Sequence, residues 1–480
     1  MPDLAIDPDL VLLVFLPPLL MNGAYFTVWR EFRQNLVGIL LLAIGAVCFT
    51  TLAVGVTARL LVPELPWAVC FALGAIVSPP DAVAAEAVLE RLSLPARLSA
   101  LLQGESLLND ASSLVLFRFA VAAALNGAFS TGAAINEFCI LSIGGTAFGL
   151  AIGYAGLFVI RRLHDSELAI TATLLMAAVA YVGGERLHVS GVLATVTTGL
   201  IAGWHQHPAF TAATRIRGQA FWKVMVFLLQ SLLFILIGLS LRGVIARAGS
   251  PALALPLLMP LLGVVAAVLV SRLACVTGSY LLIRVTRALR LRQGSTPSLA
   301  TAAVMSWAGM RGVVTLAAAL SLPVSLPGRD FILVCAFSVI LVTVLVQGTT
   351  LGPLIRLLGI VGPGEALLRQ QSEDHAWRRM AEAQFHTISM RSREADGSER
   401  HPRLVEQFGH RARVAAEYTV DRDSNRPQKL AHFDVLLDAI KASRAEILRM
   451  HRAGEIHDRV LRDLEHGLDL QQMVVESHPE

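Results

Sequence analysis

Charged residues are scarce in this 480-residue chain. They make up 16% of it, against about 25% in a typical soluble protein, and hydrophobic residues make up 55%. The shortage is uneven, because residues 364–480 hold 18 of the 40 Lys and Arg and 21 of the 36 Asp and Glu. With so few charges, residues 1–363 have no basic surface that could follow a phosphate backbone, which excludes a nucleic-acid binder and also a soluble enzyme. The sequence predicts a membrane domain over 1–363 and a water-soluble domain over 364–480.

Cysteines and N-terminal basic residues are also few. The five cysteines lie in apolar runs without metal-ligand or disulfide spacing, so they are interpreted as packing residues, and no cofactor is expected. Residues 1–9 contain three Asp and no Lys or Arg, the opposite of a signal peptide. The first apolar run is therefore expected to remain in the mature protein.

Long apolar stretches are abundant. A helix needs roughly 20 apolar residues to cross the ~30 Å hydrocarbon core, which predicts an all-α, multi-pass protein with about eleven spans. These are 10–27, 36–62, 67–88, 98–126, 134–160, 168–184, 189–203, 221–241, 252–283, 299–321 and 331–355. With the N-terminus outside, inside loops carry twelve arginines and outside loops four, so the bias toward cytoplasmic arginine places the tail in the cytoplasm.

The tail pattern predicts amphipathic helices near 366–395, 432–452 and 456–473, with polar loops at Pro402 and Pro427. The favoured interpretation is a solvated helical appendage that packs on itself or on a second copy. A ligand or pH sensor is the alternative.

Two of the predicted spans contain helix breakers. Ser78-Pro79-Pro80-Asp81 places two prolines in mid-membrane, and Gly309-Met-Arg311-Gly312 places two glycines around an arginine. Prolines remove backbone donors, so both spans are expected to open and to free carbonyls that can bind a cation. Either break alone could be a harmless kink. Broken helices in corresponding positions of two halves, here spans two to four and nine to eleven, favour a transporter site built from inverted repeats.

The fourth span carries the acidic residues that such a site needs. Ser106 and Asp110 are four residues apart and share one helical face, with Asn109 beside it and Glu105 behind. Hard oxygen ligands suit sodium, as they suit calcium and magnesium. Burial also favours the neutral form of a carboxyl group. Asp110 is therefore expected to hold either a proton or a cation.

Buried charges in a bilayer must be balanced. An ion pair between Glu105 and Arg311 is expected to join the two halves, although Arg311 could instead act as a charge substitute that affects the stoichiometry. Asp81 could cap the opened helix end or attract cations. Snorkelling toward the membrane surface is the expectation for three further charged residues, namely Glu86, Arg118 and Arg272.

The motifs resemble those of the bacterial cation/proton antiporters of the sodium/proton-exchanger type. In the order of that family, the chain contains Phe15-Leu-Pro17-Pro18-Leu, Ser78-Pro-Pro-Asp81, Gly104-Glu-Ser-Leu-Leu-Asn109-Asp110 and Trp307-Ala-Gly-Met-Arg311-Gly312. The Asn-Asp and Gly-Met-Arg-Gly stretches are the most specific.

The resemblance implies a core bundle with two crossed, unwound helices and a second bundle that forms a homodimer. It implies exchange of Na+, or of Li+ or K+, for H+ across the bacterial inner membrane, in pH and cation homeostasis. In this branch, Asn109-Asp110 goes with electroneutral exchange. By position, Asp110, Ser106 and the backbone at Pro80 are implied as Na+ ligands, Asn109 as the link to the opened helix, and Glu105 with Arg311 as the structural pair.

The chain departs from the family pattern at three places. Pro80 stands where a threonine is usual, so only a carbonyl can serve there, and Asn22 stands where an acidic residue is frequent. Family members usually begin with about two more helices before Leu10. Either the start codon is assigned too late, or the second bundle is incomplete and dimerisation is weakened.

Two functions of other classes use similar residues. A cation channel also has broken helices and an intramembrane Asp, and it would retain conduction after Asp110→Asn. An intramembrane aspartyl protease needs two aspartates, but no Gly-x-Gly-Asp surrounds Asp81 or Asp110.

Overall fold

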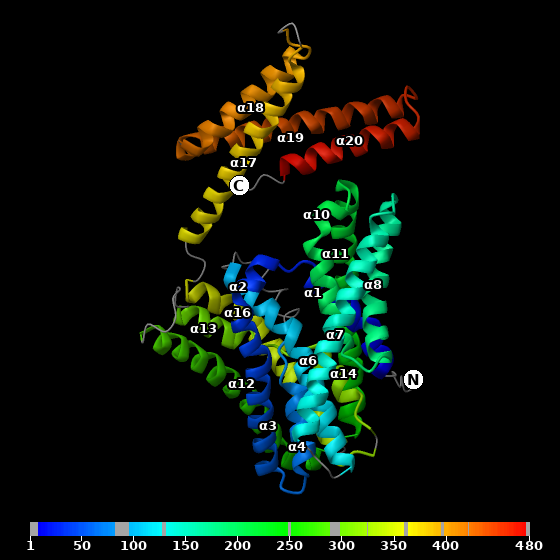
Figure 1. Ribbon diagram of the computed structural model, residues 1–480, viewed down its shortest axis with the longest axis vertical. Coiled ribbons are helices and arrows are strands. Elements are labelled where there is room, and N and C mark those ends of the chain that lie inside the picture. Colours follow the sequence, from blue (N-terminus) through cyan, green and yellow to red (C-terminus); the bar gives the residue numbers. More distant parts are fainter. Residues whose placement is uncertain are drawn as a thin grey trace. The chain divides into compact units, whose positions relative to one another are not determined.

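The computed structural model describes residues 8–81, 96–126, 131–247, 251–288, 298–323, 325–359, 363–394, 398–420 and 422–476. These residues form helices, and the one isolated β-bridge among them joins Arg393 and Glu399. The predicted all-α fold class is confirmed. The chain divides into two compact units, Met1–Val361 and Gly362–Glu480, which are described separately (Figure 1).

The first unit contains the apolar helices. They are α1 (Pro8–Tyr25), α2 (Trp29–Leu40), η1 (Leu41–Ala46), α3 (Val47–Leu61), α4 (Trp67–Val77), α6 (Ala96–Asn126), α7 (Thr131–Ile160), α8 (Ser166–Arg186), α9 (Gly191–Trp204), α10 (Gln206–Ala209), α11 (Ala212–Arg247), α12 (Pro251–Ala288), α13 (Leu299–Trp307), α14 (Val313–Leu320), α15 (Arg329–Val342), η2 (Thr343–Gln347) and α16 (Gly348–Leu357). Within the described residues, six helical segments are long and apolar enough to cross a membrane. The unit is therefore a multi-pass membrane domain.

The helices of this unit form two bundles. One, the core bundle, contains α2 to α6 and α12 to α16; α3 packs on α4 and α12, and α4 packs on α6. The other, the outer bundle, contains α1 and α7 to α11, with α9 in contact with α1, α7 and α8. In Figure 1, α3, α4 and α12 gather on one side of the unit, and α7, α8 and α11 on the other. Contacts of α1 with α14 and of α9 with α6 join the bundles.

Glycines bring the helices of the outer bundle close together. Gly145 and Gly149 lie one turn apart on α7 and face α9, where a Cβ on Gly145 would lie 2.6 Å from the carbonyl oxygen of Ser190. On α9, a Cβ on Gly203 would overlap the backbone of Tyr25 in α1. Small residues at such crossings let backbones approach, and packing is the main attraction between helices in lipid. Thr198 Oγ1 donates to Gly149 O (3.0 Å) across one of these contacts.

The second unit contains four helices, α17 (Pro363–Ser392), α18 (Pro402–Val420), α19 (Arg422–Arg452) and α20 (Asp458–Glu476). Helix α17 packs on α18, and α19 packs on α20, where Arg444 Nη2 donates to Asp469 Oδ1 (2.6 Å). The turn between α19 and α20 contains Gly454 at φ 74°, a left-handed conformation that suits glycine. The loop expected at Pro427 is wrong, because α19 begins at Arg422 and includes it.

Candidate cation site

A helix ends at each of the two predicted breaks. Helix α4 ends at Val77, and Ser78 to Asp81 lie outside any helix. Helix α13 ends at Trp307, and α14 begins at Val313. The chain after Asp81, including Glu86, lies outside the described residues until Ala96.

The two breaks contact each other directly. Asp81 N donates to Met310 O (2.7 Å), so a backbone donor freed in one break is satisfied by a carbonyl freed in the other. In the opposite direction, Arg311 Nε donates to Val77 O (3.0 Å) and Nη2 to Ser78 O (3.4 Å). These bonds meet the requirement that irregular backbone in a bilayer be satisfied within the protein.

Gly312 allows this close approach. A Cβ at this position would overlap Oδ2 of Asp81, so the Asp81 side chain rests against the backbone of the other break. Asp81 is also near enough to Asp110 to interact with it electrostatically. The two breaks and the middle of α6 therefore meet in one region.

Asn109 ties α6 to the first break. It is fully buried, and its Nδ2 donates to Pro80 O (2.8 Å). The amide oxygen, Oδ1, has no hydrogen-bond partner among the described residues. A carbonyl oxygen has two lone pairs, so Pro80 O can accept from Asn109 and still face a cation. An unpaired amide oxygen in such a place is a second available ligand.

Asp110, the next residue, carries the acidic group of this region. It is 7% exposed and lies in mid-helix on α6. Within the described residues, no hydrogen bond or ion pair involves its carboxylate, and Ser113 Oγ donates to its backbone oxygen only (3.1 Å). Half-buried Ser106 lies one turn earlier. A buried carboxyl group without a protein partner is costly when charged and must bind a proton or a cation.

The predicted partner of Glu105 is wrong. Glu105 is 1% exposed and forms a two-pronged ion pair with Arg272 of α12, which is 2% exposed. Nη1 donates to Oε1, and Nη2 donates to Oε2 (2.8 Å) and to Met305 O of α13 (3.3 Å). Snorkelling of Arg272 is wrong for the same reason. The position of Arg272 along its span could have excluded snorkelling. Arg272 lies in the middle of Leu258–Val285, too far from either end for its side chain to reach the membrane surface.

Arg311 has a different task. It is fully buried, and its side chain donates to the carbonyls of Val77, Ser78 and Gly309, while its backbone N–H donates to Thr343 Oγ1 (3.1 Å). It holds the two breaks together through backbone oxygens, which an ion pair with Glu105 would not do. Glu105 and Arg272 instead fasten α6 to α12 and α13.

A model of the sodium/hydrogen exchanger transmembrane domain matches residues 2–357. The chain belongs to this family. An uncharacterized Na+/H+ exchanger of Mycobacterium tuberculosis is 32% identical to this exchanger, over 98% of the chain and 88% of the relative. The Na+/H+ antiporter NhaP of Pseudomonas aeruginosa is 36% identical, over 71% of the chain and 79% of the relative.

The exchanger also shares its fold with a solved antiporter. The sodium proton antiporter MjNhaP1 of Methanocaldococcus jannaschii matches 74% of the exchanger and 88% of its own chain, with a TM-score of 0.56 and 20% identity. The expected antiporter fold is therefore confirmed. With relatives named as exchangers and antiporters, the function is sodium/proton exchange by a multi-pass membrane transporter, and the channel alternative gains no support.

One ion pair links the two bundles of the exchanger. Arg118 Nη2 on α6 donates to Glu185 Oε2 on α8 (2.8 Å), with the two side chains 51% and 33% exposed. Glu185 Oε1 also accepts from Gly191 N at the start of α9 (3.3 Å). Arg118, for which snorkelling was expected, is thus paired across the bundle boundary.

Proposed function

We propose that Asp110 is the residue that binds Na+ and H+ in turn. The observation that carries the proposal is the position of its carboxylate, which is buried without a described protein partner on α6, beside the contact of the two breaks. Protons and Na+ would compete for this single group. Release of one would accompany capture of the other, which is what coupled exchange requires.

Nearby oxygens complete the proposed Na+ site. Ser106 lies one turn before Asp110, and the carbonyl of Pro80 is held next to Asn109 at 2.8 Å. Asn109, which the motif also placed among the cation-binding residues, offers its unpaired Oδ1 as a further ligand. Asp81, close to Asp110, would raise the local attraction for cations. Na+, like other hard cations, is held by several such oxygens.

The charges favour electroneutral one-for-one exchange. The described charged residues of this region are three carboxylates and two guanidinium groups, namely Asp81, Glu105, Asp110, Arg272 and Arg311. Together they leave one net negative charge when all are ionised. One proton or one Na+ neutralises it equally. The loaded site then carries the same charge in both directions of transport, and the membrane potential does no net work on the cycle. A valinomycin-imposed potential should leave the Na+-driven proton flux of proteoliposomes unchanged.

Exchange in inverted vesicles tests the role of Asp110. Vesicles that hold a proton gradient receive Na+, Li+ or K+, and the native chain is compared with Asp110→Asn and with Asp330→Asn. We expect Asp110→Asn to abolish cation-induced proton efflux, because the amide cannot release a proton. Asp330 lies exposed in the first turn of α15, so Asp330→Asn should keep native exchange. The three cations also give the selectivity.

Unchanged efflux in a folded, membrane-inserted Asp110→Asn protein would refute the assignment. Uncoupled Na+ flux through that variant would instead indicate a pore.

We further propose a homodimer in the bacterial inner membrane, with the N-terminus outside and the tail inside. The asymmetry of arginines between the loops supports this orientation, and the family resemblance supports the dimer. Fusing a reporter that fluoresces only in the cytoplasm to the C-terminus tests the first, and the molar mass of the detergent-solubilised protein by light scattering tests the second. A dark fusion, or a monomeric mass, would contradict the corresponding proposal.

A further inference from the structure

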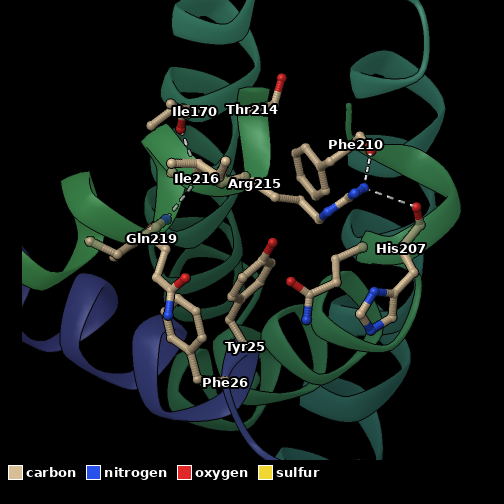
Figure 2. A pocket seen from close by; sticks show the side chains of 13 residues that line it. Tyr25, Phe26, Ile170, His207, Phe210, Thr214, Arg215, Ile216 and Gln219 are labelled. Carbon is tan, nitrogen blue, oxygen red and sulfur yellow. Dashed lines mark hydrogen bonds between the residues drawn. The ribbon is translucent and has the colours of Figure 1, made fainter. Parts of the chain in front are cut away.

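A second site lies within the outer bundle, away from the ion-binding region. A cavity of about 390 Å³ is enclosed by the end of α1, the first turns of α8, the short helix α10 and the start of α11 (Figure 2). This volume is in the range of pockets that bind small ligands. Sodium/proton exchange at Asp110 gives the cavity no role.

Two polar groups face the cavity with donors to spare. Arg215 Nη1 donates to Phe210 O (2.6 Å) and His207 O (3.4 Å), which fixes the guanidinium over the cavity. None of the described hydrogen bonds uses its Nε or Nη2. The Tyr25 side chain is only 9% exposed, and its hydroxyl, which points toward Arg215 in Figure 2, likewise has no described partner. A buried hydroxyl without a described partner, beside an exposed guanidinium that is fixed at one nitrogen and has two nitrogens unused, suits an anionic ligand.

The rest of the lining combines apolar residues with polar ones such as Gln206, His207 and Gln219. Trp222 Nε1 donates to Thr173 Oγ1 (3.3 Å), and Phe210 meets Tyr25 edge to face, with ring centroids 6.4 Å apart. Phe26 and Ile216, 40% and 54% exposed, stand at the rim. A polar interior with an exposed apolar rim on membrane-spanning helices suits a ligand with a charged head and an apolar remainder.

The charges around the cavity favour the same ligand. Among the described residues that line the cavity, Arg215 carries the permanent positive charge, and no carboxylate lines it. The nearest described acids are already engaged, because Asp165 caps α8 and Glu167 pairs with Arg217 (2.9 Å). Basic pockets between membrane helices attract the phosphates of anionic lipids.

We propose that this cavity binds the phosphate headgroup of an anionic phospholipid, with Arg215 and Tyr25 as the phosphate donors. The acyl chains would leave past Phe26 and Ile216 into the bilayer. The site would make the packing of the outer bundle dependent on lipid charge.

Lipid titration of the full-length protein in detergent tests this. The probes are dioleoylphosphatidylglycerol, dioleoylphosphatidylcholine and sodium phosphate, and the readouts are the apparent Kd from native mass spectrometry and the melting temperature. We expect only phosphatidylglycerol to bind tightly and to raise the melting temperature. Arg215→Gln should weaken its Kd at least tenfold and Tyr25→Phe about threefold, because each removes a donor to the phosphate.

Arg217→Gln is the matched control, since it removes the same charge two residues away on the same helix, outside the cavity. Its Kd should stay within twofold of the native value. Equal weakening by Arg217→Gln, or equal binding of phosphatidylcholine, would overturn the proposal. Stabilisation by inorganic phosphate alone would assign the site to a soluble anion instead. If Arg215→Gln fails to fold, Tyr25→Phe decides, and unchanged phosphatidylglycerol binding in that variant would refute the site.

Discussion

The core and outer bundles are both built from apolar helices, but they differ in the polar side chains that they bury. In the described part of the chain, all of the fully buried charged side chains lie in the core bundle, namely Glu105, Asp110, Arg272 and Arg311. The buried polar residues of the outer bundle are threonines and a serine, which bond within or between its helices. Close-packed glycines occur in both bundles, so the buried charges are what distinguish the core.

The buried charges lower the stability of the core, and we expect them to serve transport. Each buried charge in the core needs a partner, and Asp110 has none among the described residues, which is the basis of its proposed role. The outer bundle contains no such group among its described residues. We expect the outer bundle to act as a frame against which the core moves. Substitutions in the core should therefore alter transport, stability or both, whereas substitutions in the outer bundle should alter stability alone.

The largest loss of stability should follow Glu105→Gln. It leaves Arg272 buried and charged without its partner, which typically costs about 3–5 kcal/mol. Thermal unfolding of the purified protein measures the effect. Glu185→Gln, in the exposed pair with Arg118, is the control and should cost less than about 1 kcal/mol.

Replacing both partners, in Glu105→Leu with Arg272→Met, should recover much of the lost stability, since no unpaired charge remains. Equal melting temperatures for Glu105→Gln and Glu185→Gln would contradict the assignment of the buried pair.

Gly312→Ala and Gly203→Ala test the comparison between the bundles directly. The new methyl group at 312 would push Asp81 from the contact of the breaks, and the one at 203 would separate α9 from α1. We expect Gly312→Ala to weaken the apparent Na+ affinity of exchange at least tenfold. Gly203→Ala should lower the melting temperature and leave the apparent affinity of the remaining folded protein unchanged. The reverse pattern would remove the distinction between a moving core and a frame.

A smaller effect is expected from Asn109→Ala. It removes the hydrogen bond to Pro80 O and leaves that buried carbonyl unsatisfied, which typically costs about 1–3 kcal/mol. Unfolding experiments at saturating and at low Na+ separate this cost from lost ion binding. A variant that keeps both native stability and native Na+ affinity would show that the Asn109 link is dispensable.

The smallest effect should come from Thr198→Val in the outer bundle. The substitution removes the bond from Thr198 Oγ1 to Gly149 O, and hydrogen bonds between membrane helices average about 0.6 kcal/mol. The melting temperature should fall slightly, with exchange unchanged. A fall as large as that of Glu105→Gln would mean that the outer bundle depends on polar contacts after all.

Local signals in the sequence were enough to predict the breaks. Pro79-Pro80 and the glycines around Arg311 disrupt helices through their own backbone chemistry, so their positions could be found without a structure. The acidic residues of α6 were found for a similar reason, because few charges occur in the apolar spans.

Partners far apart in the chain could not be assigned in this way. The sequence offered Arg272 and Arg311 as possible partners of Glu105. The ion pair with Arg272 depends on how α12 packs in the core bundle, which the sequence does not specify. The cavity beside Tyr25 has no motif either, since it is formed by the ends of four separate helices. The loop expected at Pro427 is absent, because α19 runs through this residue despite the low helix propensity of proline.

The bond from Asp81 N to Met310 O has a consequence for the transport cycle. It joins the two breaks, and the side chain of Arg311 adds further hydrogen bonds between them. Neither half-helix can shift alone without exposing bare peptide groups to hydrocarbon. We therefore expect the two breaks to move as one unit during transport, with the boundary to the outer bundle where α1 and α9 contact α14 and α6.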